Sequence, residues 1–107
     1  MGESTDMIYN KLVRDKIPEI IENNGGTPNY RVLENQEYLV ALEKKLDEEV
    51  GEYHRDKTPE ELADILEVVY ALAATSGCSR EQLMAIYQQK HDNRGGFEKR
   101  YYLISSE

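Results

Sequence analysis

Carboxylates interrupt the apolar rows of two neighbouring segments that have helical spacing. Positions 39, 42, 46, 49 and 53 follow the three-and-four spacing of a buried helix face, yet position 49 is Glu49, and Glu52 follows three residues later. Further along the chain, Glu61 and Asp64 are also three residues apart. Because side chains at this spacing share one face of a helix, each helix is predicted to present a pair of acids beside its apolar stripe.

These two pairs of acids are candidate metal ligands. Two antiparallel helices would bring the four carboxylates together at the edge of the core. Several like charges are very costly to bury unless a counter-charge neutralises them, and an all-oxygen set of ligands favours Mg²⁺ or Mn²⁺ over zinc or copper. The sequence therefore predicts a magnesium site, with manganese as a second possible ion. The competing interpretation is a solvated acidic helix face, which is the usual role of such runs.

Basic residues gather in two places that could bind phosphate. Lys11, Arg14 and Lys16 stand at the start of the first expected helix, while Lys90 and Arg94 stand near the end of the last one. In a chain of net charge −8, such clusters could clamp phosphate groups and complement a metal. We favour Lys90 and Arg94, because they continue the face of a helix that ends at a glycine pair. Ordinary surface and helix-end charge is the alternative for each residue.

The elements that must position these residues are helices. The first is expected to begin at Asp15 as its N-cap, and two further starts, Thr58 with Glu61 and Ser79 with Gln82, resemble capping boxes. Apolar periodicity and glycine pairs set the remaining boundaries. The expected helices cover about residues 16–22, 35–53, 58–76 and 79–93.

The fold is predicted to be a compact all-α bundle of about four helices. The third helix is apolar around much of its girth, so we expect it to be the central and most buried one. Residues 30–33 and 97–104 could form short strands that pair with each other or with residues 8–13. A chain of 107 residues has a thin core, which predicts completion by a homo-oligomer, a dimer or a dimer of dimers.

Composition narrows the class of protein. The chain has 21 acidic and 13 basic residues, and such a charge repels nucleic-acid backbones. Cys78 is the single cysteine, no run reaches the roughly 18 apolar residues of a membrane span, and the start lacks the features of a signal peptide. We therefore expect one cytoplasmic domain over residues 1–107, with residues 1–7 as a loose leader and with neither nucleic acid nor membrane as a partner.

Two smaller features concern the neighbourhood of the site. Gly51 lies in mid-helix between the acids, where glycine costs up to about 1 kcal/mol relative to alanine. It either allows the close approach of a ligand or another backbone, or is simply tolerated. The chain has no tryptophan, so any stacking on a nucleotide base would use Tyr9, Tyr30 or Phe97.

Four segments together resemble a known family. The run Glu48–Glu52 followed by Glu61-Leu62-Ala63-Asp64 resembles the paired ExxE and ExxD metal motifs of MazG-like nucleotide pyrophosphohydrolases. The opening NKLVRDKIP, residues 10–18, and the ending KHDNRGGF, residues 90–97, are similar to a branch described as phosphoribosyl-ATP pyrophosphohydrolase-like. The resemblance covers about residues 8–103, and the ordered set of four segments is more specific than either acidic motif.

The resemblance implies an all-α bundle completed by oligomerisation, and hydrolysis of the α–β phosphoanhydride of a nucleotide to a monophosphate and pyrophosphate. It also implies that Glu48 supports a ligand or activates water, and that magnesium is bound by the residues that match the motifs, Glu49, Glu52, Glu61 and Asp64. Only eight residues separate Glu52 from Glu61, which leaves little material for a loop that recognises the base.

Two alternative functions stay open at this point. One is the same chemistry narrowed to phosphoribosyl-ATP in histidine biosynthesis. The other belongs to a different class, a non-catalytic helical module whose acidic face binds a partner or only a cation.

Overall fold

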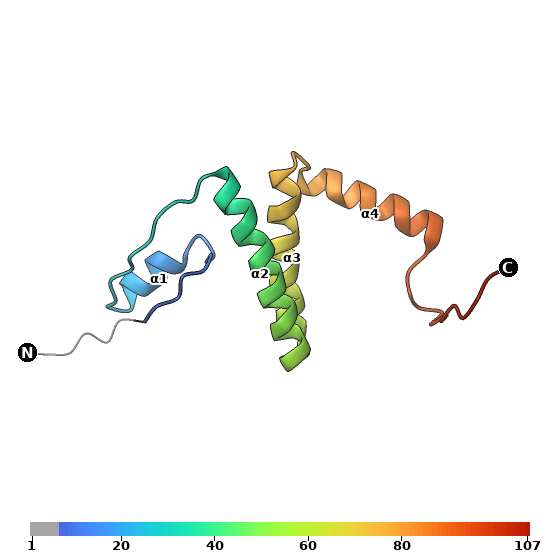
Figure 1. Cartoon of the computed structure of the whole chain (residues 1–107), viewed down its shortest axis with the longest axis horizontal. Helices are drawn as coiled ribbons and strands as arrows, with labels where there is room; N and C mark the ends of the chain where they lie inside the picture. Colours follow the sequence, from blue (N-terminus) through green and yellow to red (C-terminus); the bar gives the residue numbers. More distant parts are fainter. Residues whose placement is uncertain (1–6) are drawn as a thin grey trace, which may run out of the picture.

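The fold is all-α, as predicted. A computed structural model describes residues 7–107, and within this range it contains four helices and no strand (Figure 1). Residues 30–33 and 97–104 therefore do not pair as strands. Of the expected leader, residues 1–6 lie outside the described part, and Met7 is an exposed coil residue. The helices are α1 (Ile17–Asn23), α2 (Asn35–Asp56), α3 (Pro59–Thr75) and α4 (Arg80–Arg94).

Helix α1 is a short helix that does not pack on the other three. Pro18 lies in its first turn, where a missing N–H does no harm. Its N-cap is Lys16 and not Asp15, and no side chain caps the helix. The expected N-cap at Asp15 is therefore wrong. Asp15 lies inside a turn that the Ile17 N–H closes by donating to the Arg14 carbonyl at 3.0 Å, and the first helical bond runs from the Ile20 N–H to the Lys16 carbonyl at 3.0 Å.

Helices α2 and α3 form an antiparallel hairpin joined by Lys57 and Thr58. Lys57 adopts the left-handed conformation, with φ of 54°, and its N–H donates to the Tyr53 carbonyl at 2.7 Å, which ends α2. Thr58 makes no side-chain cap, so the expected capping box with Glu61 does not form. The Glu61 carboxylate does not bond to the helix end, and it lies instead near Glu49 and Glu52 of α2.

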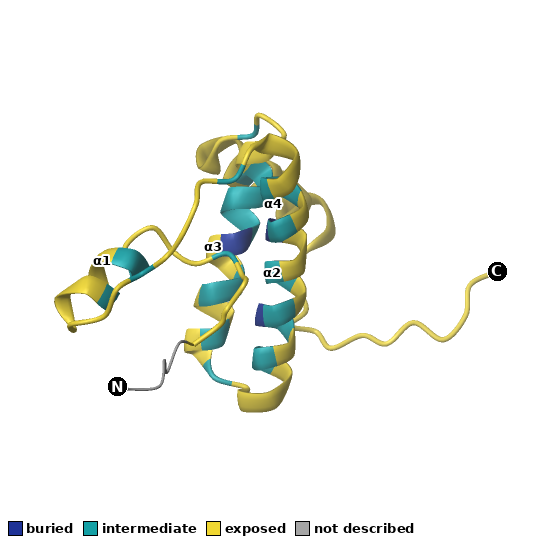
Figure 2. Cartoon of the chain, turned by 60° about the vertical axis from the view of Figure 1, so that its left-hand side comes forward, coloured by how far each residue is buried: buried dark blue, intermediate teal, exposed yellow. Residues whose placement is uncertain are grey.

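The core lies between α2 and α3 and is thin. Leu42 of α2 and Val68 of α3 are the buried apolar residues, with 2% and 6% of their surface exposed (Figure 2). Helix α3 contacts both α2 and α4, as expected of the central helix. It is not the most buried helix, because it has one buried residue, Val68, whereas α2 has Leu42 and Glu49. The outer face of α3 is uncovered in this chain, since Leu62 and Leu66 are 50% and 47% exposed.

Helix α4 turns away from the hairpin. Ser79 and Gln82 form the predicted capping box, in which the Gln82 N–H donates to Ser79 Oγ at 3.1 Å and the Ser79 N–H donates to the Gln82 side chain at 2.8 Å. The axes of α3 and α4 are bent by 107° relative to each other. Beyond α4 the chain is extended and exposed, which contributes to an overall length of 73 Å (Figures 1 and 2).

No single helix within residues 7–107 is both long enough and apolar enough to cross a membrane. Helices α3 and α4 meet such a requirement only when they are taken together, across the bend between them.

Candidate metal centre

The hairpin brings the four predicted acids together. Glu49 and Glu52 come from the second half of α2, while Glu61 and Asp64 come from the first turns of α3, and the antiparallel packing sets these two stretches side by side. One carboxylate oxygen from each residue lies within 4.8 Å of the corresponding oxygens of the other three. Glu49 is buried and the other three are half-buried. This acidic cluster could hold a metal ion, as the spacing of the acids predicted.

Two oxygens of the acidic cluster have no partner among residues 7–107. Glu49 Oε2 and Glu61 Oε2 are buried and accept no hydrogen bond. A buried acceptor without a partner is costly, and more so when it carries charge. A divalent cation would supply the missing partner, and a set of four carboxylates suits a hard cation that prefers oxygen ligands. The four carboxylates are therefore suitable ligands for the hard divalent cation that the sequence predicts.

The surroundings of the acidic cluster raise the pKa values of Glu49 and Glu61. Burial raises the pKa of Glu49, and the neighbouring Glu52 carboxyl raises it further, while Lys45 opposes both. Burial likewise raises the pKa of Glu61, and the negative charge of Glu52 adds to the effect. Both shifts mean that the ionised carboxylates are disfavoured where they lie, so additional positive charge at this position would stabilise them.

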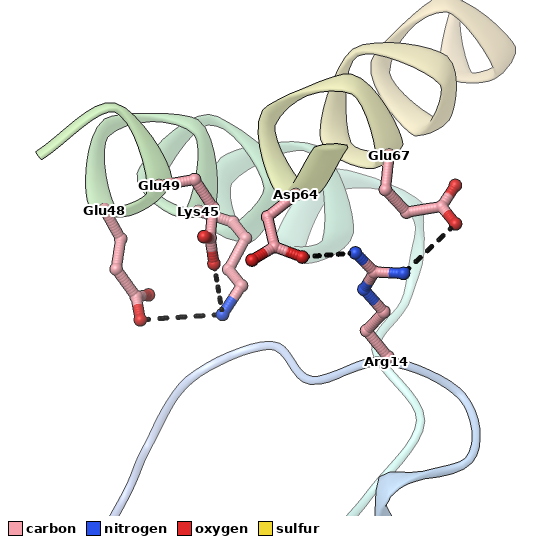
Figure 3. Close-up of polar contacts among 6 residues, drawn as sticks. All are labelled: Arg14, Lys45, Glu48, Glu49, Asp64 and Glu67. Atoms are coloured by element: carbon pink, nitrogen blue, oxygen red, sulfur yellow. Dashed lines mark hydrogen bonds and ion pairs between the residues drawn. The ribbon is translucent and has the colours of Figure 1, made fainter. Parts of the chain in front are cut away.

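Lys45 supplies part of that positive charge. Its Nζ lies 3.3 Å from Glu49 Oε1 and 3.5 Å from Glu48 Oε1, and only 16% of the side chain is exposed (Figure 3). Lys45 was not among the site residues predicted from the sequence. Its spacing of four residues from Glu49 on a helix could have revealed it, since side chains at that spacing are neighbours.

Glu48 lies beside the acidic cluster and is held by two lysines. Lys11 Nζ donates to Glu48 Oε1 at 3.1 Å, and this hydrogen bond raises the pKa of Lys11. Burial pushes the pKa of Glu48 upward, but the hydrogen bond from Lys11 and the charge of Lys45 outweigh it, so this pKa lies below its usual value. Glu48 is thus ionised at neutral pH and adjacent to the buried ligand candidate Glu49.

Arg14 reaches the opposite side of the acidic cluster from the N-terminal segment. One of its terminal nitrogens lies 2.6 Å from Asp64 Oδ1, and the other lies 3.5 Å from Glu67 Oε1 (Figure 3). Arg14 and Lys11 therefore both approach the carboxylates across more than 35 residues of sequence. These two members of the predicted phosphate clamp lie at the site.

The other three predicted clamp residues lie elsewhere in the chain. Lys16 is the N-cap of α1, and Lys90 and Arg94 lie in the last turns of α4, whose C-terminal end is directed away from the hairpin (Figure 1). None of the three forms an ion pair with another residue in the range 7–107. Our preference for Lys90 and Arg94 over the N-terminal residues stays a prediction.

Comparison with known proteins adds a short sequence match. No family model matches the chain, and no solved structure matches it. An uncharacterized protein of Mycolicibacterium smegmatis is 57% identical over 42 residues, which is 39% of this chain and 43% of that protein. The match thus spans less than half of the length of that relative.

Proposed function

We propose that this protein is a magnesium-dependent nucleotide pyrophosphohydrolase of the MazG-like kind. In the reaction, water adds to the α-phosphorus of a nucleoside triphosphate, the bond from that phosphorus to the α–β bridging oxygen breaks, and a monophosphate and pyrophosphate leave. The observation that carries the proposal is the convergence of four carboxylates from two helices, with two buried oxygens that lack partners. The ordered motifs around these residues support the same activity.

The residues that would hold the cation are Glu49, Glu52, Glu61 and Asp64. When it is bound, the ion supplies neutralisation of phosphate charge and orientation of water. The metal-free acidic cluster by itself would repel a triphosphate, because substrate and site are both anionic. This repulsion explains why an acidic site suits a phosphate ester only together with a cation.

Glu48 is the candidate that orients the attacking water. Its carboxylate is ionised and lies next to the ligand candidate Glu49, so it can accept a hydrogen bond from a water molecule. Lys11 and Lys45 hold this carboxylate through contacts of 3.1 and 3.5 Å. The same two ammonium groups are placed to meet phosphate oxygens on that side of the acidic cluster.

Arg14 is the candidate phosphate contact on the other side. Its guanidinium pairs with Asp64 and Glu67 at 2.6 and 3.5 Å. Since the side chain is about half exposed, it can exchange one carboxylate for a phosphate oxygen when a nucleotide binds. Lys90 and Arg94 would join the clamp only if α4 of a second copy reaches the hairpin.

We also propose that the protein is a homo-oligomer, most simply a two-fold dimer. The outer face of α3 carries Leu62 and Leu66 half exposed, and the segment after α4 carries Phe97 and Tyr102 at 96% and 90% exposed. Apolar surface of this kind is stabilised by burial against another chain. A second copy provides such surface without requiring a different partner.

The direct test of the proposed activity is a panel of canonical and modified nucleoside triphosphates, together with phosphoribosyl-ATP, incubated with magnesium. We expect pyrophosphate and a monophosphate as products. Release of single phosphates would indicate a different phosphohydrolase. The absence of any turnover across the panel, with magnesium binding intact, would favour the non-catalytic acidic module.

A further inference from the structure

A groove of about 420 Å³ lies next to the acidic cluster. It is bounded by residues 10–12, by Arg31 and Leu33 of the connector that precedes α2, and by one face of the first two-thirds of α2. Lys45 and Glu48 line this groove, and Lys45 also contacts Glu49 at 3.3 Å. The groove is therefore continuous with the proposed phosphate site, and it contains none of the four candidate metal ligands.

Apolar and amide side chains together line the groove. Aliphatic surface comes from Leu12, Leu33 and Val40, and Val40 is 46% exposed. The primary amides of Asn10 and Gln36 lie in the same lining and offer both donors and acceptors of hydrogen bonds. Most of the lining residues are polar or charged, yet most of the exposed surface of the groove is apolar, which is typical of sites for small organic ligands.

The charge of the groove lining is opposite to that of the whole chain. Four of its residues are basic and two are acidic, whereas the chain carries a net charge of −8. Arg31 is held in place by Glu37, with two contacts of 2.7 and 3.2 Å. The remaining basic residues of the lining are Lys11, Lys44 and Lys45. A ligand with an apolar part and an anionic end complements this surface.

These features match one part of a nucleotide. A volume of 420 Å³ lies in the lower part of the range of about 300–1,000 Å³ for small-molecule pockets, which suits a base with its sugar. We propose that this groove binds the nucleoside part of the substrate while the phosphates lie at the acidic cluster, with the amides of Asn10 and Gln36 contacting the edge of the base. This inference rests on the proposed function, because the phosphates determine which end of the ligand faces Lys45.

The groove does not contain the aromatic residues that were expected to stack on a base. Tyr9, Tyr30 and Phe97 were the candidates for stacking on a base, and none of them lines the groove. Contact with the base is therefore aliphatic, through residues such as Leu12 and Val40. Selectivity between bases follows from the two amides, since a hydrogen-bonding group left without its partner discriminates more strongly than a change in apolar contact.

The test compares the binding of two probes by calorimetry in magnesium. One is an α,β-methylene nucleoside triphosphate, offered with each of the four common bases, and the other is inorganic tripolyphosphate, which has no nucleoside. The variant Val40→Phe fills the groove from an exposed helix position. The matched control is Ile86→Phe, a β-branched residue that is 48% exposed on α4 and lies outside the groove.

We expect Val40→Phe to weaken nucleotide binding by about tenfold or more and to change tripolyphosphate binding less than twofold. Ile86→Phe should change neither. A second variant, Asn10→Gly, removes one amide and tolerates the positive φ of 46° at that position. We expect it to narrow the differences in affinity among the four bases without weakening tripolyphosphate binding.

Several results would overturn the proposal, and they are distinguishable from a failure of the proposed function. Equal binding of nucleotides and tripolyphosphate by the wild type would show that no nucleoside site exists. Unchanged nucleotide affinity in both Val40→Phe and Asn10→Gly would place the base elsewhere, while the phosphate site stands. A change of oligomeric state in Val40→Phe, without any effect on nucleotide affinity, would mean that a second copy covers the groove. Binding of neither probe by the wild type would refute the proposed function, and this inference with it.

Discussion

The α2–α3 hairpin and the region from α4 to the C-terminus differ in how far their side chains are paired and buried. In the hairpin, long-range ion pairs from Lys11 and Arg14 reach the carboxylates, and the buried residues Leu42 and Val68 lie at its interface. In residues 80–107 no side chain is buried, and Phe97 is 96% exposed. Several charged groups of the hairpin are thus paired with other residues, whereas most of the apolar surface of the C-terminal region is left uncovered within residues 7–107.

The two regions also differ in how far the local sequence determines their structure. The hairpin is a local structure, because its two helices are consecutive and are joined by two residues, so the spacing of its acids determines where they meet. The position of α4 depends instead on one bend between residues 75 and 80 and on whatever surface covers the region beyond. The candidate chemistry lies in the hairpin, whereas the predicted assembly depends on the C-terminal region and on the outer face of α3.

The largest expected effect comes from the buried acid of the hairpin. We expect Glu49→Gln to reduce magnesium-dependent hydrolysis by at least about a hundredfold, because loss of even an outer partner of a metal ligand typically costs 10–100-fold. The measurement is steady-state pyrophosphate release. Glu43→Gln, an exposed acid on the same helix that is outside the acidic cluster, should retain nearly full activity. Similar activities in the two variants would remove the distinction between the acidic cluster and ordinary surface charge.

The next effect compares Arg14, a clamp residue that reaches the hairpin from the N-terminal segment, with Lys90 of α4. Arg14→Ala should reduce catalytic efficiency by about tenfold to a hundredfold, since a charge-assisted contact to phosphate is worth roughly 1.5–3 kcal/mol. Circular dichroism and magnesium titration should be unchanged. Lys90→Ala decides the role of α4, because a comparable loss would place α4 of a second copy at the site. If both variants kept wild-type efficiency, the phosphates would lie elsewhere.

The next prediction concerns assembly through the uncovered apolar surface of α3 and of the C-terminal region. We expect sedimentation at micromolar concentration to give a mass of at least twice the 12.4 kDa of one chain. Leu66→Glu should shift the population toward monomer, because it places a charge on the half-exposed face of α3. Leu66→Met, which keeps the apolar character, is the control. A stable wild-type monomer would contradict the assembly.

The smallest expected effect concerns Gly51, which lies in the hairpin between acids of the cluster. A Cβ atom added to Gly51 would meet nothing within 4 Å in this chain, and the position is an exposed helix interior. Gly51→Ala should therefore raise the free energy of unfolding by about 0.5–1 kcal/mol, measured by urea titration. Destabilisation, or a loss of hydrolysis, would show that a ligand or a second chain approaches this backbone closely.

Much of the hairpin could be predicted because the relevant signals are local. The three-residue spacing of the acids predicts that each pair shares a helix face, and Glu49 indeed lies close to Glu61 and Asp64 of α3. The short connector was not predicted, because α2 runs to Asp56, three residues beyond its expected end. The predicted capping box at Thr58 was wrong for a physical reason, since the Glu61 carboxylate faces α2 and is not available to the helix end. Ser79 has no such competition, and its capping box formed as expected.

The contacts that sequence reasoning could not supply are long-range. Nothing in residues 10–18 indicates that Lys11 pairs with Glu48 and Arg14 with Asp64, because these pairs depend on how the N-terminal segment folds back onto the hairpin. The groove arises in the same way, from three separate segments. The expected strand over residues 97–104 had a suitable mixture of residues but found no partner strand in the described chain.

The most direct test of the central claim, that the hairpin holds a divalent cation, is calorimetric titration of the metal-free protein with magnesium. Wild type and Glu43→Gln should bind with the same affinity, and Glu49→Gln should bind at least about tenfold more weakly. This result is expected because Glu49 supplies the most buried carboxylate of the four, with an oxygen that has no other partner. Indistinguishable titrations of wild type and Glu49→Gln would show that the acidic cluster is not the metal site.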